Sequence, residues 1–383
     1  MATENKIKLL FVSTLNSVGG HEVLWFETAK IALAKGYQVG ICVYENKFSA
    51  QRLRPLLHYP NLHLFYKKPL SEWQEVFNRF FNTEFKFISI NKRAIKWQPD
   101  LTLFTGGTNL PLGNDIKLFA KKDLRFCFVG HNGNDLLWLS DSQSKSLKEV
   151  FAKSAMNYFV SQANLNLARM QVISRIDNAE IVRNPFNVAY DNNIPFPDDK
   201  CLHFAQVGTY DFEAKGQDIL LQVLSLPKWR ERNVEINFYG SGVHKNRLKE
   251  TIKMLGLANV NVCGFCKTED IWRHNHVLLM PSRHEGLPMA IVEAMLCGRV
   301  VVATAVSGNP EVIDDNVTGF LAQSPAVKCF DEAMEKLWQR RIELQSIGQA
   351  ARNGIKKLVP PNPAEVFLNK LLSNIDCRTD ISS

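Results

Sequence analysis

Short, almost continuously apolar runs alternate along the chain with longer stretches of helical periodicity. In the first half these runs cover residues 7–13, 37–44, 100–105, 124–130, 156–161 and 179–185. Strands that are apolar nearly throughout are typical of parallel sheets buried on both faces. A helical stretch over residues 21–35 separates the first two runs. The pattern therefore predicts βαβ units in a doubly wound α/β sheet.

The same rhythm restarts after a stretch rich in proline, asparagine and aspartate, residues 184–200. Further strands are expected at 201–208, 234–240, 259–265, 276–282 and 299–304, with helices from Gln217, around 245–255 and over 287–297. The pattern predicts two Rossmann-like domains, residues 1–185 and 201–361, joined by a linker over 186–200. A last helix, 364–375, is expected to pack back on the first domain. Two facing domains of this kind form an interdomain cleft between the carboxyl ends of their strands. We expect the ligand to bind there, because ligands of such sheets bind beyond the carboxyl ends of the strands.

Composition and charge narrow the class of protein. The chain has 383 residues, of which 45% are hydrophobic and 22% charged, as in globular proteins. No apolar run reaches the roughly 18–20 residues of a membrane span, and no signal-peptide pattern opens the sequence, so we expect a cytoplasmic protein. The net charge of +8 and the pI near 9.0 favour an anionic partner. Without an RNP-type motif or zinc-finger spacing, nucleic acid is the weakest candidate.

Neither cysteine nor aspartate predicts a metal or redox site. The eight cysteines mostly lie within apolar stretches and are expected to be small buried hydrophobes rather than disulfides. Cys263-Gly-Phe-Cys266 fits the C-x-x-C pattern, but it ends a strand-like run instead of opening a helix. No aspartate cluster indicates a metal site, so we expect metal-independent chemistry.

One stretch mixes aromatic and basic residues. Residues 71–97 carry Trp73 and several phenylalanines among Lys and Arg side chains. A basic aromatic helix can lie on an anionic membrane surface. It can equally turn its aromatic stripe to the core and its basic face to water.

Glycine-containing loops follow several predicted strands. Gly19 and Gly20 lie between the first strand and the first helix, and Gly240-Ser241-Gly242 ends a strand of the second domain. Glycine lets a backbone approach a ligand closely, and the N–H groups at a helix N-terminus face anions. Ordinary turns explain such glycines equally well.

Lys215 and His131 also follow predicted strands. Lys215-Gly216 opens a helix after the first strand of the second domain, where a flexible ammonium suits a phosphate. His131 ends a strand of the first domain and is a candidate ligand contact. A solvated lysine and a structural histidine are the alternatives.

Two glutamates stand eight positions apart in RHEGLPMAIVEAM, residues 283–295. Pro288 suits the first turn of a helix, which leaves Glu285 in the preceding loop and Glu293 inside the helix. The path between them is up to roughly 12 Å at a helical rise, which exceeds the separation of glycosidase carboxylates. Two contacts on one extended ligand fit this spacing better. A carboxylate in the apolar surroundings of Glu293 needs hydroxyl or N–H partners, either from a ribose or from nearby backbone.

Together these motifs resemble the retaining GT-B glycosyltransferases of family 4. The resemblance rests on Gly19-Gly20, Lys215-Gly216, the Gly240–Gly242 turn and Glu285-x7-Glu293, and it extends to Ser307–Glu311 and Thr318–Leu321. It is dense over residues 201–325 and sparse before them. One departure is Thr209, which stands where the family usually has arginine. Arg183, Arg283 or a lysine of the second domain could take over that role.

The resemblance implies a role for each site residue. Glu293 would bind the ribose of a nucleotide-sugar donor, Glu285 the transferred sugar, and the backbone of Gly286 and Leu287 the sugar and diphosphate. Lys215 would neutralise the diphosphate. Gly19 and Gly20 would close over the reaction centre, and His131 would lie near the acceptor, a glycan or a lipid-linked sugar.

The implied reaction is glycosyl transfer with retained anomeric configuration and no cofactor, since the nucleotide sugar is a co-substrate. The resemblance suggests front-face attack, in which the leaving phosphate oxygen takes the acceptor proton. Two alternatives share the fold. A catalytically weak nucleotide-sugar-binding protein would explain Thr209, and an epimerase would convert sugars without an acceptor.

Overall fold

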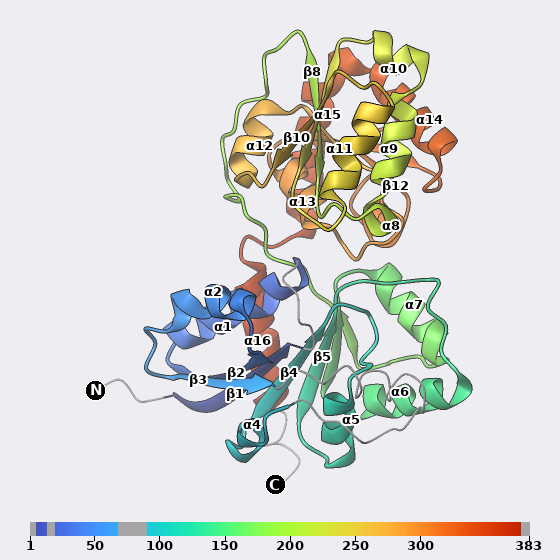
Figure 1. The fold of residues 1–383 in the computed structure, drawn as a ribbon. Helices are drawn as coiled ribbons and strands as arrows, with labels where there is room; N and C mark the ends of the chain where they lie inside the picture. Colours follow the sequence, from blue (N-terminus) through green and yellow to red (C-terminus); the bar gives the residue numbers. More distant parts are fainter. Residues whose placement is uncertain (1–4, 14–19, 68–89, 377–383) are drawn as a thin grey trace. The chain divides into compact units, whose positions relative to one another are not determined.

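The computed structural model describes residues 5–13, 20–67 and 90–376, which form two compact units (Figure 1). The first unit comprises the described residues up to Pro185 and those from Asn362 onwards, and the second spans Phe186–Pro361. The chain therefore passes between the units twice, after Pro185 and after Pro361.

The first unit is built on a parallel sheet, seven-stranded within the described residues, with strand order β3-β2-β1-β4-β5-β6-β7. Its strands are β1 (Asn5–Ser13), β2 (Tyr37–Tyr44), β3 (Leu62–Lys67), β4 (Leu101–Gly106), β5 (Phe126–Gly130), β6 (Met156–Phe159) and β7 (Ala179–Ile181). β4 and β5 are buried over their whole length and β2 over residues 39–43, as their continuous apolar runs require. The strand order reverses between β1 and β4, which is the switch point of a doubly wound sheet.

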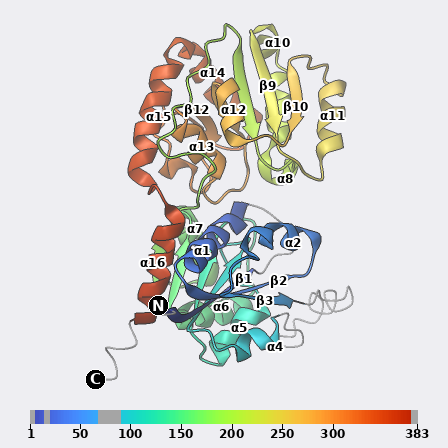
Figure 2. The ribbon, with the colours of Figure 1, turned by 90° about the vertical axis from the view of Figure 1, so that its left-hand side faces the viewer.

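Helices cover both faces of this sheet. On one face lie η1 (Gly20–Glu22), α1 (Val23–Ala34), α2 (Lys47–Leu53), η2 (Arg54–Leu56) and α16 (Pro363–Asp376). On the other lie α4 (Lys92–Lys96), α5 (Asn114–Lys121), α6 (Asp141–Lys153) and α7 (Gln162–Val172). α16 packs along α1 (Figure 2) and buries Phe367, Leu368 and Leu371 against the first sheet. The end of the chain thus completes the core of its beginning.

The second unit repeats the plan with six strands among the described residues, in the order β10-β9-β8-β11-β12-β13, all parallel. They are β8 (Leu202–Val207), β9 (Val234–Tyr239), β10 (Val260–Gly264), β11 (Val277–Met280), β12 (Val300–Thr304) and β13 (Phe320–Ala322). Here the order reverses between β8 and β11. This reversal decides where the candidate site forms.

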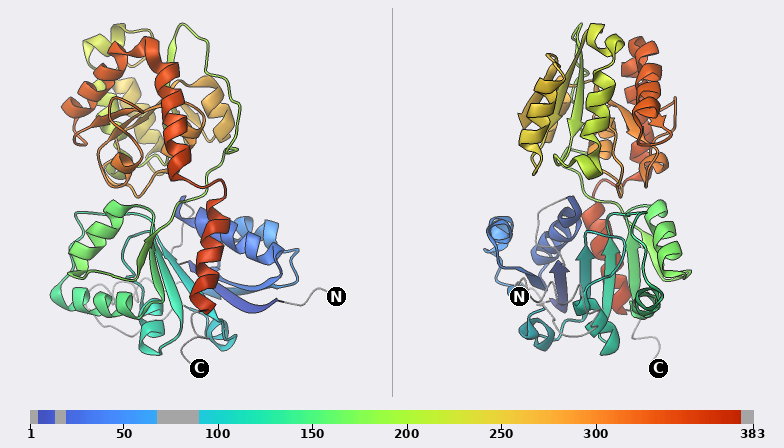
Figure 3. Two further views of the ribbon diagram at one scale, coloured as in Figure 1. Left: turned by 180° about the vertical axis from the view of Figure 1, so that it is seen from behind. Right: turned by 45° about the vertical axis from the view of Figure 1, so that its right-hand side comes forward.

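The helices of the second unit also lie on both sides of its sheet (Figure 3). They are α8 (Phe212–Lys215), α9 (Gln217–Leu224), α10 (Pro227–Glu231), α11 (Lys245–Met254), α12 (Thr268–His274), α13 (Met289–Leu296), η3 (Asn309–Glu311), α14 (Val327–Gln339), η4 (Arg341–Glu343) and α15 (Leu344–Leu358). One core joins α9, α10, α11 and α14 to the strands. α13 packs against α15 and β12.

Residues 186–200, which the sequence predicts as a linker, belong to the second unit. The side chains of this stretch bond to the second unit: Tyr190 donates to the carbonyl of Lys356 and Asn192 to that of Leu296. In return Arg299 donates to the carbonyl of Pro195, with its guanidinium over the Phe196 ring. This stretch, which has few apolar residues, is therefore attached to the second unit mainly through hydrogen bonds.

β3 is a strand that the sequence pattern does not predict. Its residues are mostly half-buried, and His63 and Tyr66 interrupt the apolar pattern. Most of the aromatic and basic stretch 71–97 lies outside the described residues. Within the described part of the chain, no helix has the length and apolarity needed to cross a membrane.

Candidate functional site

The switch point of the second sheet brings two sequence-distant residues together. Lys215 follows β8 and Glu285 follows β11, and these two strands are neighbours in the sheet. Parallel strands end at the same edge, so the loops that follow them meet there. Lys215 Nζ donates a hydrogen bond of 2.7 Å to Glu285 Oε1.

Local structure fixes the position of Lys215. Asp211 caps α8 by accepting hydrogen bonds from the N–H groups of Glu213 and Ala214, so that Lys215 ends a single helical turn. Gly216 then adopts a left-handed φ of 64°, and a Cβ at this position would lie 2.1 Å from the carbonyl oxygen of Pro281. Only glycine allows this close passage between the loops after β8 and β11.

The Lys215–Glu285 pair is unevenly exposed. Glu285 is buried, with 5% of its surface exposed, whereas a quarter of the Lys215 side chain reaches solvent. A buried carboxylate costs free energy unless it is paired, and Lys215 provides the partner. The pair therefore places one negative and one positive group next to each other at the same edge of the sheet.

Arg283, predicted as a donor contact, is bonded within the second unit. Its two terminal nitrogens donate to the two carboxylate oxygens of Asp218 at 2.9 and 2.8 Å, and Nη1 also donates to the carbonyl of Phe212. The Asp218 carboxylate raises the pKa of Arg283 above its ordinary value. Thr209, where the resemblance expects arginine, is exposed, and its carbonyl accepts from Gln217.

Glu293 lies within α13 and is 4% exposed. Its Oε1 accepts two hydrogen bonds of 2.9 Å from Asn187, one from the backbone N–H and one from Nδ2. Burial raises the pKa of Glu293 to about 7, although the Asn187 bonds lower it in part. Both bonds from Asn187 end on the same oxygen. The sequence does not predict this partner, because Asn187 lies 106 positions earlier, in the predicted linker.

The N-terminus of α13 lies between the two glutamates in sequence. Pro288 precedes the first helical residue, and no side chain caps this end. Leu287 is buried, while the carbonyl of Gly286 accepts from the N–H of Gly308 at 2.9 Å. The loop that includes Ser307–Glu311 is thereby held against the loop before α13. Helix N-terminal N–H groups without a capping side chain are suited to bind an anionic group.

The glycines after β9 allow another close contact between loops. A Cβ on Gly240 would lie 1.9 Å from the Gly208 carbonyl oxygen, and one on Gly242 would lie 2.4 Å from that of Tyr210. Close approach to the loop after β8 therefore requires both glycines. Nearby in sequence, Val243 is 89% exposed, and Phe265, after β10, is 87% exposed. Sequence reasoning missed these two exposed apolar residues, because a single apolar residue in a loop gives no periodic signal.

The first unit holds the remaining predicted residues. His131 follows β5 and is buried, with Nε2 3.3 Å from the hydroxyl of Thr105 at the end of β4. Gly20 begins η1, and Gly19 lies outside the described residues. Ser13, at the end of β1, donates to the buried carboxylate of Glu22 at 2.8 Å, a contact that the sequence did not predict.

The second unit matches a known family. Residues 192–354 fit the family model described as glycosyl transferases group 1. This part of the chain is therefore similar to the glycosyl transferases group 1 family. It contains Lys215, Glu285 and Glu293, and Asn187 lies just before it.

Curated proteins similar to this chain include several glycosyltransferases. An uncharacterized glycosyltransferase of Haemophilus influenzae is 24% identical over 82% of this chain and 85% of its own length. The amylovoran biosynthesis glycosyltransferase AmsK of Erwinia amylovora is 30% identical over 37% of this chain and 37% of its own length. Two other curated relatives are matched over only 38% and 40% of their own length.

Solved structures share the whole two-domain architecture. Alr3699/HepE of Anabaena, solved in complex with UDP, has a TM-score of 0.73 at 18% identity and covers 96% of this chain and 100% of its own. The chain thus has the GT-B fold of two Rossmann-like domains.

Proposed function

We propose that this protein is a retaining glycosyltransferase, which moves a sugar from a nucleotide-diphosphate sugar to a glycan or a lipid-linked acceptor. The observation that carries the proposal is the Lys215–Glu285 pair at the switch point of a domain similar to the glycosyl transferases group 1 family. A cation, a buried carboxylate and a helix N-terminus there match the diphosphate and hydroxyl groups of such a donor.

Each group of the donor has a proposed partner in the second unit. The diphosphate is bound by Lys215 Nζ and by the N–H groups at the start of α13, beside Gly286 and Leu287. Glu285 accepts hydroxyls of the transferred sugar, and Glu293 accepts those of the ribose through the oxygen that Asn187 does not contact. Gly240 and Gly242, together with Thr209 in the loop after β8, are further proposed contacts of the donor.

The proposed step breaks the bond between the sugar and the phosphate oxygen and forms a bond to the acceptor oxygen on the same face. The acceptor proton goes to the departing phosphate oxygen. Negative charge grows on that phosphate, so the positive Lys215 stabilises the transition state more than the ground state. We propose that no metal ion takes part. In the first unit His131, Gly19 and Gly20 are the proposed contacts of the acceptor side.

The acceptor is proposed to belong to polysaccharide or glycoconjugate synthesis, as the name of the Erwinia relative suggests. We place the reaction in the cytoplasm, with contact to the inner face of an anionic membrane as a further proposal. Sedimentation with anionic and neutral liposomes tests that contact, and equal recovery with both would contradict it.

The deciding experiment incubates the protein with UDP-, GDP- and ADP-sugars and a glycan extract. Release of nucleoside diphosphate together with a new glycan product is expected, and Glu285→Ala should abolish it. A protein that binds a donor but releases nothing would be a binding protein. Conversion of the donor sugar without an acceptor would indicate an epimerase.

A further inference from the structure

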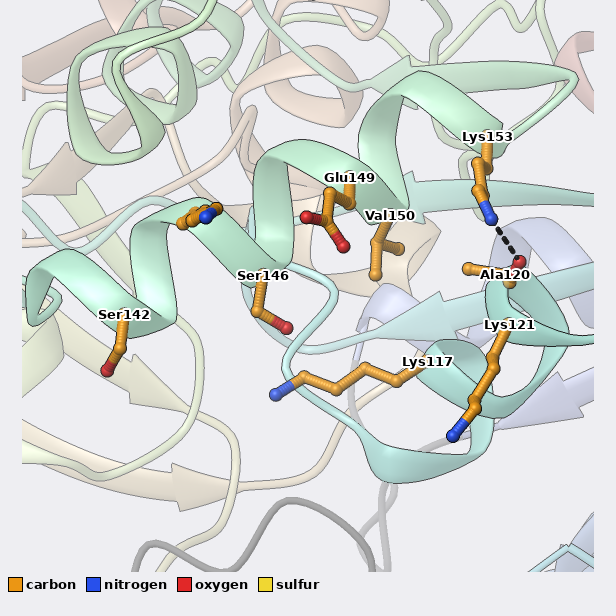
Figure 4. A pocket seen from close by; sticks show the side chains of 9 residues that line it. Lys117, Ala120, Lys121, Ser142, Ser146, Glu149, Val150 and Lys153 are labelled. Atoms are coloured by element: carbon orange, nitrogen blue, oxygen red, sulfur yellow. Dashed lines mark hydrogen bonds between the residues drawn. The ribbon is translucent and has the colours of Figure 1, made fainter.

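A groove on the first unit lies between α5 and α6, away from the residues discussed so far (Figure 4). Its volume is about 470 Å³, which is within the range of sites for small ligands. Its lining consists of basic, hydroxyl-bearing, acidic and small apolar side chains: Lys117, Ala120, Lys121, Ser142, Lys145, Ser146, Glu149, Val150 and Lys153.

Positive charge dominates this groove. Four lysines line it against one carboxylate, that of Glu149. Lys153 closes part of the rim by donating to the carbonyl of Ala120 at 3.1 Å. The ammonium groups of Lys117 and Lys145 have no hydrogen bond or ion pair with any described residue. These groups are available to an anionic ligand.

We propose that this groove binds an acidic glycan, as a holding site for the acceptor chain outside the reaction centre. The proposal rests on the proposed glycosyltransferase function and adds the class of acceptor. Lysines contact the carboxylate or phosphate groups of the chain, while Ser142, Ser146 and Glu149 exchange hydrogen bonds with its hydroxyls. Ala120 and Val150, both buried, form an apolar floor for the C–H faces of sugar rings.

The chemistry of the lining favours a glycan over a lipid surface. A membrane surface is broad, and lysines attract it wherever they are exposed. Here two serine hydroxyls and a carboxylate share a concave site with the lysines. The carboxylate of Glu149 repels the acidic groups of either ligand, but with the two serines it forms a set of hydrogen-bonding groups that matches the hydroxyls of a glycan.

The test measures binding of tetragalacturonate to the full chain by calorimetry at physiological salt. Maltotetraose, of equal length and without charge, is the neutral probe. Lys117→Glu and Lys145→Glu reverse charges inside the groove. Lys148→Glu is the matched control, because Lys148 is exposed on the same helix and does not line the groove. We expect tetragalacturonate to bind more tightly than maltotetraose, and each groove variant to weaken it about tenfold or more.

Three results would overturn the proposal. An equal loss in Lys148→Glu would indicate attraction by the overall positive charge. Absence of tetragalacturonate binding up to about 1 mM would exclude an acidic glycan. Binding of the protein to phosphatidylglycerol vesicles, abolished by Lys117→Glu while tetragalacturonate fails to bind, would make the groove a membrane contact. Binding and turnover of the nucleotide sugar are measured on the same samples, so failure of the glycosyltransferase function is seen separately.

Discussion

Lys215 and Glu285 are 70 positions apart in sequence and form a hydrogen-bonded ion pair of 2.7 Å at the switch point of the second sheet. Each residue is the other's electrostatic partner before any donor binds. A diphosphate would compete with Glu285 for the lysine, and the sugar hydroxyls would then compensate the released carboxylate. The two side chains are therefore expected to act at different parts of one donor.

Substitution of each partner separates these roles. In Glu285→Gln the lysine loses its carboxylate partner, so nucleoside diphosphate should bind equally well or more tightly while transfer falls by about 100-fold or more. Lys215→Met should weaken both. Calorimetry with the nucleoside diphosphate and a transfer assay measure the two effects. Equal weakening of nucleoside diphosphate binding in both variants would contradict the assignment.

Glu293 makes nucleoside binding depend on pH. Because burial raises its pKa to about 7, the carboxylate that accepts ribose hydroxyls forms only as the pH rises through that value. Affinity for the preferred nucleoside should increase between pH 6 and pH 8, by about tenfold. A nucleoside is the suitable probe, since it carries no phosphate that titrates in this range. In Glu293→Gln the pH dependence should disappear, and a profile that persists would rule out this carboxyl as its source.

The same group affects stability with the opposite sign. Between the ordinary pKa of 4.5 and the raised value of about 7, the folded protein binds a proton that the unfolded chain releases. Stability from this group is therefore lost as the pH rises through that window, by up to about 3 kcal/mol. Glu293→Gln has no group that titrates in this window and should not show this loss of stability. In denaturant unfolding, the free energy of unfolding of the variant relative to the natural protein should therefore be higher at pH 8 than at pH 5.

Burial raises the pKa of Glu293, and Asn187 is expected to limit that rise. Its side-chain bond lowers that pKa, so Asn187→Ala should move the pH midpoint of nucleoside binding upward by roughly half a unit to one unit. Asn192→Ala is the matched control, because Asn192 lies in the same stretch and bonds to the carbonyl of Leu296 without contacting Glu293. An equal shift in both variants would mean that loosening of the stretch, not the bond to Glu293, is responsible.

Gly216 is constrained by contact as well as by backbone conformation. Alanine there adopts an unfavourable φ of 64° and places Cβ 2.1 Å from the Pro281 oxygen. Gly256 has nearly the same φ, 61°, but a Cβ there would lie 4.0 Å from its nearest neighbour, the end of the Arg230 side chain. Gly256→Ala should cost about 1 kcal/mol, and Gly216→Ala should cost about 2 kcal/mol more and weaken nucleoside diphosphate binding through Lys215. If Gly216→Ala and Gly256→Ala lose the same unfolding free energy, the loop moves away from the new Cβ at no cost and the contact with Pro281 is not a constraint.

Arg299 holds the start of the second unit in place without a carboxylate partner among the described residues. It is 1% exposed and donates to the carbonyls of Trp272, Cys297 and Pro195. Burial lowers its pKa to about 10, so it remains charged at neutral pH. Arg299→Met leaves these carbonyls without their donors, and unfolding in urea should show a loss of about 3 kcal/mol. A loss below about 1 kcal/mol would mean that water replaces the guanidinium.

Several elements follow from local pattern alone. Continuous apolar runs gave β2 at its observed bounds, and β8, β9, β11 and β12 within one or two residues. Edge strands were harder. β3 is half-buried with a broken apolar pattern, so its hydrogen bonds to β2 decide that it is a strand.

The sequence by itself determined the doubly wound class, because buried parallel strands need apolar residues on both faces. It also marked Lys215 by its place after a strand, and Glu285 and Glu293 by their spacing and by the apolar surroundings of Glu293. Only the tertiary structure decided their partners. Strand order joins Lys215 to Glu285 and Asp218 to Arg283, and the stretch that begins the second unit brings Asn187 to Glu293. The spacing of residues along a chain reveals the periodicity of single helices and strands, which is a local property. Hydrogen bonds between loops depend on which strands are neighbours, and that is settled only when the whole domain packs.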